Sequence, residues 1–318
     1  MNIILTGITG NIGYEVARIL LDEANLVIPV IRGKNGNNIP QRLSEINPDF
    51  SKITEFILAD LENEIPKFDL KNTDCIIHCA GVVHFKKSGN SNERMMENLL
   101  VFAHGTSIPI YYVSTAYLFK PHNEPLFNEY EVDKSNAENR LALSGSPHTV
   151  LRPSIVTGNS QTGRIVHFSG YYLIVPAFLE ALRKSEKIRF PSIKNTVNII
   201  PADWVARSIV DAVKSNERGT FYITNQNPPS FDALLNLTLS FYGLDNRIDF
   251  VGCSFDEYKN LDLSDEEERL FNACMPFIPY LVTGYDFPVS LCKQSLDSDY
   301  IGKILKRFNL SQNERLGK

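Results

Sequence analysis

Tyr130 and Lys134 are four residues apart, a spacing that places both side chains on one face of a helix. A lysine ammonium beside a phenol favours the phenolate, so we expect it to lower the pKa of the tyrosine. Such a tyrosine can donate a proton to a carbonyl oxygen or accept one from an alcohol. The pair therefore predicts acid–base chemistry at an oxygen that is being reduced or oxidised.

Two neighbouring hydroxyls precede this pair. The apolar run from Ile108 to Val113 predicts a strand, and Ser114 and Thr115 follow it directly. A hydroxyl at a strand end can hydrogen-bond the reacting oxygen and hold the substrate, or it can simply cap the backbone. Because Tyr130 and Lys134 lie downstream, we favour the first interpretation, with Thr115 as the main donor and Ser114 as the second.

A glycine pattern near the start of the chain is typical of a phosphate-binding loop. The run Thr-Gly-Ile-Thr-Gly-Asn-Ile-Gly follows one predicted strand and opens a predicted helix from Asn11 to Asp22. Glycines in these places permit a tight turn, let the backbone approach a pyrophosphate and let the helix pack closely on the strand. The free N–H groups of the helix then face the phosphates. The residues expected at this loop are Gly7, Thr9, Gly10, Asn11, Ile12 and Gly13.

The end of the second predicted strand, Leu26 to Ile31, indicates the type of dinucleotide. A site that prefers NAD usually carries an acidic residue about 20 residues into the unit, which binds the ribose 2′-hydroxyl. Here Arg32 follows the strand, and Lys34 and Arg42 lie beyond it. Since a cation suits a 2′-phosphate, we expect NADP(H) rather than NAD(H). A solvated basic loop is the alternative.

Further cofactor contacts are expected where later strands end. Asp60 can accept a hydrogen bond from the adenine amino group while Leu61 lies against the ring, although a helix cap would also account for Asp60. Small residues after the fourth strand would let a dinucleotide lie across the edge of the sheet. The residues expected there are Cys79, Ala80, Gly81 and Val113.

The order of strands and helices indicates the fold class. Short apolar runs alternate with helical patterns through the first half, which predicts a doubly wound α/β fold with a parallel sheet covered on both faces. The pattern loosens after Gly158. We expect residues 1–160 to form a Rossmann-type dinucleotide-binding domain, to whose sheet residues 188–225 return. Residues 161–187 and 226–318 should form a smaller substrate-binding region.

Composition argues against several other classes of protein. The 318 residues carry a net charge of −5, without the basic surplus of nucleic-acid binders. No apolar run reaches the roughly 20 residues of a membrane span, and the chain opens on an apolar strand rather than a signal peptide. The five cysteines and the histidines show no metal-ligand spacing. We therefore expect a cytoplasmic protein without nucleic-acid, membrane or metal partners.

Together these motifs resemble the extended short-chain dehydrogenases/reductases, over residues 1 to about 225. The matching features are the glycine pattern, Ser114-Thr115-Ala116, Tyr130 with Lys134, and the segment from Arg152 to Val156. The resemblance implies a nicotinamide cofactor and a catalytic triad of Thr115, Tyr130 and Lys134. It also implies a homodimer formed through the helices that begin near Asn92 and Asp133. The residues that it implies beside the nicotinamide are Pro153, Ser154, Ile155 and Val156.

Within that family, the chain is similar to the thioester reductases and fatty acyl-CoA reductases. The segment from Arg152 to Arg164 and the run from Ser114 to Tyr117 carry this likeness. Sugar-nucleotide epimerases and dehydratases usually continue such a run with Tyr-Gly, whereas this chain has Phe119 and Lys120. The resemblance thus implies hydride transfer from NADPH to an acyl thioester or an aldehyde. The expected substrate contacts are Val83, Phe85, Phe119, Arg164, Phe168 and Tyr172.

Other functions stay open on the sequence alone. A ketone or secondary-alcohol dehydrogenase, or a sugar-nucleotide epimerase or dehydratase, would have the same fold. A non-catalytic NADP(H)-sensing regulator would keep the glycine loop, but the intact set of Thr115, Tyr130 and Lys134 argues against it. Arg164 is expected either to meet a phosphate of coenzyme A or phosphopantetheine, or to lie on the surface.

Overall fold

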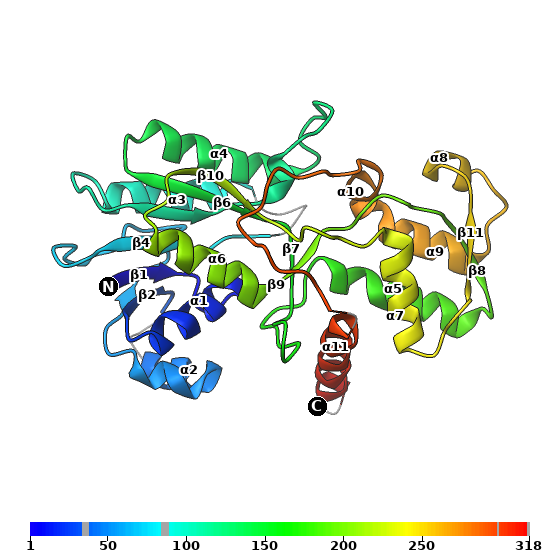
Figure 1. Cartoon of the computed structure of the whole chain (residues 1–318), viewed down its shortest axis with the longest axis horizontal. Helices are drawn as coiled ribbons and strands as arrows, with labels where there is room; N and C mark the ends of the chain where they lie inside the picture. Colours follow the sequence, from blue (N-terminus) through cyan, green and yellow to red (C-terminus); the bar gives the residue numbers. More distant parts are fainter. Residues whose placement is uncertain (34–37, 84–88, 298, 317–318) are drawn as a thin grey trace.

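The computed structural model describes residues 1–33, 38–83, 89–297 and 299–316, which form a sheet-based lobe and a smaller lobe that is mainly helical (Figure 1). No helix of these residues is long and apolar enough to cross a bilayer. The strands are β1 (Asn2–Thr6), β2 (Leu26–Ile31), β3 (Ile57–Leu58), β4 (Cys75–His78), β5 (Ile110–Val113), β6 (His148–Pro153), β7 (Ile155–Thr157), β8 (Ile188–Pro191), β9 (Ile199–Pro201), β10 (Gly219–Ile223) and β11 (Ile248–Val251). The helices are α1 (Asn11–Asp22), α2 (Ile39–Ile46), α3 (Ser91–Phe102), α4 (Glu129–Leu143), α5 (Tyr171–Lys184), α6 (Ala202–Lys214), α7 (Phe231–Phe241), α8 (Phe255–Tyr258), α9 (Asp265–Cys274), α10 (Ile278–Val282) and α11 (Tyr300–Leu316).

Seven strands form one parallel sheet in the order β10-β6-β5-β4-β1-β2-β3. The chain starts at β1, proceeds outward through β2 and β3, and then returns to place β4 on the other side of β1. The strand order therefore reverses between β1 and β4, and open α/β sheets bind their ligands at such a switch point. The predicted doubly wound α/β fold is confirmed.

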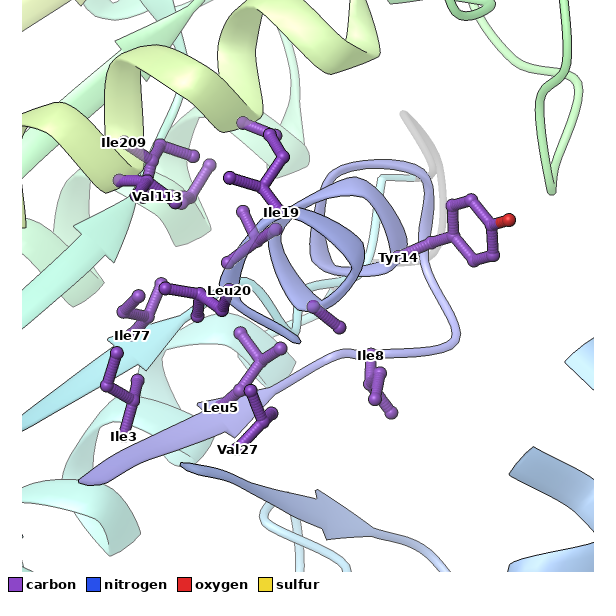
Figure 2. Close-up of a cluster of buried hydrophobic side chains, with 14 of the residues drawn as sticks. Ile3, Leu5, Ile8, Tyr14, Ile19, Leu20, Val27, Ile77, Val113 and Ile209 are labelled. Atoms are coloured by element: carbon purple, nitrogen blue, oxygen red, sulfur yellow. The ribbon is translucent and has the colours of Figure 1, made fainter. Parts of the chain in front are cut away.

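Helices cover both faces of this sheet, with α1 against α6 on one face and α3 against α4 on the other (Figure 1). Figure 2 shows the core on the first face, where Ile3 and Leu5 of β1 lie beneath Ile19 of α1, and Ile209 of α6 lies nearby. These four side chains are at most 3% exposed. Alternate residues of each strand point to opposite faces, so β1 also supplies Ile4 to the core beneath α3 and α4.

One expected strand placement is wrong, because β8 belongs to the smaller lobe. Of residues 188–225, β10 does return to the large sheet beside β6, but β8 pairs with β11 in a separate two-stranded sheet, and β9 pairs with β7. The reason is hydrophobic: Phe190 of β8 is fully buried and packs against Phe178 of α5 and Phe255 of α8. The apolar side chains of β8 are thus covered by the smaller, mainly helical lobe, which we call the second lobe, rather than by α1 and α6.

A buried histidine lies at the switch point. His78 ends β4, is 1% exposed, and has its Nδ1 atom 2.7 Å from Oγ1 of Thr6 at the end of β1. The same Thr6 oxygen accepts the N–H of Ala80 at 3.0 Å. The ring of His78 stacks on Tyr112 of β5 with centroids 5.4 Å apart. Burial above all, and then the charge of Lys134, lowers the pKa of His78 to about 3, so the ring is neutral at physiological pH.

From the lowered pKa of His78 we predict that the folded protein loses stability in acid. Its pKa is about 3 in the folded chain against an ordinary 6.5, so between these pH values the unfolded chain binds one more proton. The free energy of unfolding should therefore fall below pH 6.5, with this residue contributing about 1.4 kcal/mol per pH unit. Urea unfolding between pH 4 and pH 7 measures the slope.

The control is a variant that lacks this imidazole. His78→Gln should reduce the slope by about one proton. Equal slopes in the wild type and in His78→Gln would contradict the assignment.

Candidate active site

A pocket of about 530 Å³ lies at the carboxyl ends of the strands, between the large sheet and the second lobe. The glycine loop after β1, the ends of β4, β5 and β6, and the start of α4 form its sheet-side wall. Most of the residues expected to act at the site meet here. Those that line the pocket are Gly10, Asn11, Ile12, Cys79, Gly81, Val113, Ser114, Thr115, Tyr130, Lys134, Pro153, Ser154, Ile155 and Val156.

The glycine loop brings the start of α1 against this wall. Gly7 has a φ of +75°, and a Cβ atom there would lie 2.6 Å from the nitrogen of Ala80, so only glycine fits. A Cβ on Gly13 would lie 2.2 Å from the carbonyl oxygen of Gly7. Gly10 is the N-cap of α1, and no side chain caps this end. The first N–H groups of α1 are therefore left to an anion from outside the chain.

The side chain of Asn11 joins this loop to the second lobe. Its oxygen accepts the N–H groups of Val166 and His167 at 3.1 and 2.7 Å, and its nitrogen donates to the carbonyl of His167 at 2.8 Å. The imidazole of His167 lies 3.1 Å from the carbonyl oxygen of Thr9. His167 and its neighbour Phe168 both line the pocket, so the phosphate loop and the second-lobe wall are held together.

Tyr130 lies in the first turn of α4 rather than ahead of the helix. The expected helix start at Asp133 is too late, because Asn128 caps the helix by accepting the N–H of Glu131 at 3.1 Å. Lys134 follows one turn later, donates to the carbonyl of Val113 at 3.1 Å, and lies 4.9 Å from the ring centroid of Tyr112. The cap thus brings the tyrosine and the lysine to the end of β5.

The two hydroxyls after β5 differ in their partners. The side chain of Thr115 hydrogen-bonds Tyr130 and accepts the N–H of Tyr117 at 3.4 Å. Oγ of Ser114 is buried and, among the described residues, has no hydrogen-bond partner. Because a buried polar atom rarely stays unpaired, Ser114 is available to a group that enters the pocket.

Burial sets the protonation of the tyrosine–lysine pair. It raises the pKa of Tyr130 to about 12, although the hydrogen bond from Thr115 acts in the opposite direction. Burial also lowers the pKa of Lys134 to about 8, against the charges of Asp133 and Glu138. The expected lowering of the tyrosine pKa is therefore wrong, because both side chains are removed from water.

Asn92 and Asp133 support the wall beside Lys134. The amide of Asn92 bonds both the N–H and the C=O of Val82, at 3.0 and 3.1 Å, and donates to Asp133 at 2.7 Å. A Cβ on Gly81 would lie 2.9 Å from Oδ1 of Asn92 and 3.0 Å from Nζ of Lys134. The segment after β4 is thus fixed against the lysine, through an aspartate whose role the sequence did not reveal.

The expected contacts with the adenosine half lie outside the described pocket lining. Arg32 follows β2 directly and is exposed, and Arg42 donates to its carbonyl at 3.2 Å. Asp60 bonds within its own turn, to the N–H of Glu62 at 3.4 Å and to the amide of Asn63 at 2.8 Å. Leu61 is 5% exposed and packs in the core beneath α3, so the expected contact of Leu61 with a ring is not supported.

Of the expected substrate contacts, Val83 and Phe168 line the pocket. Phe85 lies outside the described residues. Phe119 packs instead on Tyr222 and Phe287, with centroids 6.1 and 6.2 Å away.

The side chains of Arg164 and Tyr172 are also not part of the described pocket lining. Arg164 donates to the carbonyl of Ile46 at 2.7 Å and lies 4.4 Å from the ring centroid of Tyr14, which corrects its expected contact with a coenzyme phosphate. The hydroxyl of Tyr172 accepts the N–H of Gly158 at 3.0 Å. Both side chains are used to hold loops together.

Sequence reasoning missed most of the second-lobe wall. This wall comes mainly from α5, α7 and α10, whose sequences carry no functional motif. The additional lining residues include Tyr171, Leu173, Ile174, Val175, Phe178, Val197, Phe231, Leu234, Leu235, Thr238, Phe277, Tyr280 and Leu281.

Two protein-family models match the chain. The model described as "Male sterility protein" matches residues 120–209, and that described as "NAD dependent epimerase/dehydratase family" matches residues 3–142. The L-2-aminoadipate reductase large subunit of Eremothecium gossypii is 27% identical over 354 residues, which cover 93% of this chain and 24% of that protein. L-2-aminoadipate reductase of Saccharomyces cerevisiae is 26% identical over 337 residues, covering 87% of this chain and 23% of that protein. The chain thus spans about a quarter of these relatives.

Solved structures show the same fold. A thiolation-reductase di-domain from an archaeal non-ribosomal peptide synthetase superposes with a TM-score of 0.73 at 17% identity, over 98% of this chain and 76% of that one. The terminal R domain of the myxalamid PKS-NRPS pathway gives a TM-score of 0.70 at 20% identity, over 96% of this chain and 90% of that one. UDP-glucuronic acid 4-epimerase from Bacillus cereus, in complex with UDP-glucuronic acid and NAD, gives 0.63 at 16% identity, with 97% and 100% covered.

The two family models meet within the segment that carries Tyr130 and Lys134, and between them they extend from β1 to α6. Together with the reductase relatives and the sheet order, they bear out the resemblance seen in the motifs. In its motifs, its family-model matches and its fold, the chain is thus similar to the extended short-chain dehydrogenases/reductases of the thioester reductase-like type.

Proposed function

We propose that the chain uses NADPH to reduce an acyl thioester or an aldehyde, with Tyr130 as the proton donor. One observation carries the proposal: Ser114, Thr115, Tyr130 and Lys134 line the same pocket as the uncapped start of α1. This arrangement sets acid–base groups beside a site for a dinucleotide. The names of the relatives, L-2-aminoadipate reductases and reductase domains of peptide synthetases, favour a carbonyl held as a thioester.

The residues present fit a nicotinamide dinucleotide. The first turn of α1 contains no acidic residue and no side-chain cap, so its N–H groups and dipole suit a pyrophosphate. The small residues Gly81 and Cys79 leave the wall beside Lys134 open, and Oγ of Ser114 lacks a partner among the described residues. When bound, the cofactor supplies the hydride. We assign its binding to residues 1–160 with β10, and substrate binding to the second lobe.

Tyr130 is suited to donate a proton during reduction. Because its pKa is raised to about 12, the phenol stays protonated at neutral pH and can protonate the carbonyl oxygen as negative charge develops there. The Thr115 hydroxyl, which bonds Tyr130, orients the phenol, and the unpaired Ser114 hydroxyl offers a second donor to the oxyanion. Lys134, held by the Val113 carbonyl, places a cation beside the phenol and the expected ribose.

Addition of a hydride and a proton accounts for both substrates. An aldehyde becomes an alcohol when its carbonyl carbon takes the hydride and its oxygen takes the proton of Tyr130. A thioester becomes a hemithioacetal in the same way, and this product expels the thiol to leave an aldehyde. Reduction of a thioester therefore releases one free thiol for each NADPH consumed in the first step.

Tyr130→Phe should lower kcat about 100-fold or more, the usual contribution of a positioned proton donor, with the Kd for NADPH changed less than about threefold. NADPH oxidation and thiol release from acyl-CoA measure the rate. Tyr222→Phe is the control, since Tyr222 bonds Arg152 outside the pocket lining. Retention of most of the activity in Tyr130→Phe would contradict the role of this phenol.

Arg32→Ala should weaken NADPH binding about tenfold or more, because a charge-assisted hydrogen bond to the 2′-phosphate is lost. The affinity of this variant for NADH should be unchanged. Arg140→Ala, which removes a cation paired with Glu93 on α3, should leave the affinity for both cofactors unchanged. Calorimetric titration of the wild type and both variants with NADPH and NADH gives the six dissociation constants. Equal affinity of the wild type for NADPH and NADH would exclude the role of Arg32.

A further inference from the structure

The second-lobe half of the pocket is lined mainly by apolar side chains. Ile174 and Phe178 of α5, Leu234 and Leu235 of α7, and Leu281 of α10 are among its lining side chains. Among the described residues, this half of the lining contains no aspartate, glutamate, lysine or arginine. A ligand group that extends from the sheet side into the second lobe therefore meets an apolar surface without a counter-charge.

Two hydroxyl groups between α5 and α7, those of Tyr171 and Thr238, already have partners within the protein. The hydroxyls of Tyr171 and Thr238 lie 2.6 Å apart, and Thr238 donates its own hydrogen to the carbonyl of Leu234 at 2.7 Å. Since a threonine hydroxyl has one hydrogen, Tyr171 is the donor of the pair. Neither group has a hydrogen left for a carboxylate.

The hydroxyl of Tyr280, on the side of the pocket next to α4, also has its hydrogen-bond partners within the protein. Its hydroxyl donates to Glu131 at 2.7 Å and accepts from Asn128 at 2.6 Å. Glu131 is fully buried and pairs with Lys120 at 2.8 Å, so the charge of this glutamate already has a partner. A bound ionic group would have to break these contacts to find a partner.

From this lining we infer that the substrate carries an apolar acyl group without an ionised group, which lies between α5, α7 and α10. The inference rests on the proposed thioester or aldehyde reduction and narrows its substrate. The inferred substrate differs from L-2-aminoadipate, for which the relatives are named. The acyl group of L-2-aminoadipate bears an ammonium and a carboxylate. An unpaired charge is strongly disfavoured in an apolar site, whereas each buried methylene is favourable.

The decisive test compares two thioesters of equal length, hexanoyl-CoA and adipoyl-CoA, which differ by a terminal carboxylate. We expect kcat/KM of the wild type with NADPH to favour hexanoyl-CoA by about 100-fold or more. It should rise about fourfold for each methylene added from butanoyl to octanoyl-CoA. Hexanal and 6-oxohexanoate give the same comparison without the coenzyme. Equal turnover of the charged and uncharged members of either pair overturns the inference.

A charge placed in the wall should reverse the preference. Leu235→Arg, or Thr196→Arg at a half-buried lining position, should shift the ratio at least tenfold towards the carboxylate, with NADPH affinity retained. Leu237→Arg adds the same charge to the outer face of α7, where Leu237 is 49% exposed, and should leave the ratio unchanged. A shift of the same size in Leu237→Arg would contradict the pocket as the cause.

Failure of the proposed reaction gives a different result. Lack of turnover of every thioester and aldehyde, in a wild type that binds NADPH, would contradict the reductase function and with it this substrate. Turnover of the charged substrates alone would contradict only the apolar acyl group. If an arginine variant does not fold, the two wild-type comparisons still decide the inference.

Discussion

The close approach of α1 to the turn after β1 is the constraint on which the site depends. Gly13 packs against the carbonyl of Gly7, and Gly7 packs against the backbone of Ala80 after β4, at distances that no side chain would allow. These contacts hold the start of α1 at the carboxyl ends of β1 and β4, where the strand order reverses. The positive end of the helix dipole and N–H groups without a side-chain cap therefore lie at the switch point of the sheet. Ser114, Thr115, Tyr130 and Lys134 line the same pocket.

Burial decides what the catalytic groups can do. Tyr130 and Lys134 are both removed from water, and this raises the pKa of the tyrosine while it lowers that of the lysine. Both shifts favour the uncharged forms. A protonated phenol is the form that a carbonyl reduction needs, so the dry setting suits proton donation more directly than the proximity of a cation does.

Glu131, the residue after Tyr130, links the two lobes. Glu131 is fully buried, pairs with Lys120, accepts the N–H of Phe127 at 2.7 Å and accepts the hydroxyl of Tyr280 from the second lobe. On the opposite side, Asn11 bonds the backbone of the loop that carries Phe168. The apolar wall is thus attached at two points to the elements that carry the tyrosine and the phosphate loop. These two attachments fix the position of the apolar wall relative to Tyr130 and the glycine loop.

Local pattern was enough to predict the sheet lobe and the acid–base set. The glycine spacing, the apolar runs and the Tyr130–Lys134 interval depend on residues close in the chain, and turns and helices are local structures. The sequence by itself therefore determined the α/β class and the glycine turn before α1, and it identified Ser114, Thr115, Tyr130 and Lys134, which the structure brings to one pocket. Tertiary structure alone decided that Arg164 and Tyr172 hold loops, that β8 joins β11, and that α5, α7 and α10 form an uncharged wall. Those outcomes depend on contacts between segments as many as 150 residues apart, where packing rather than local preference selects the partner.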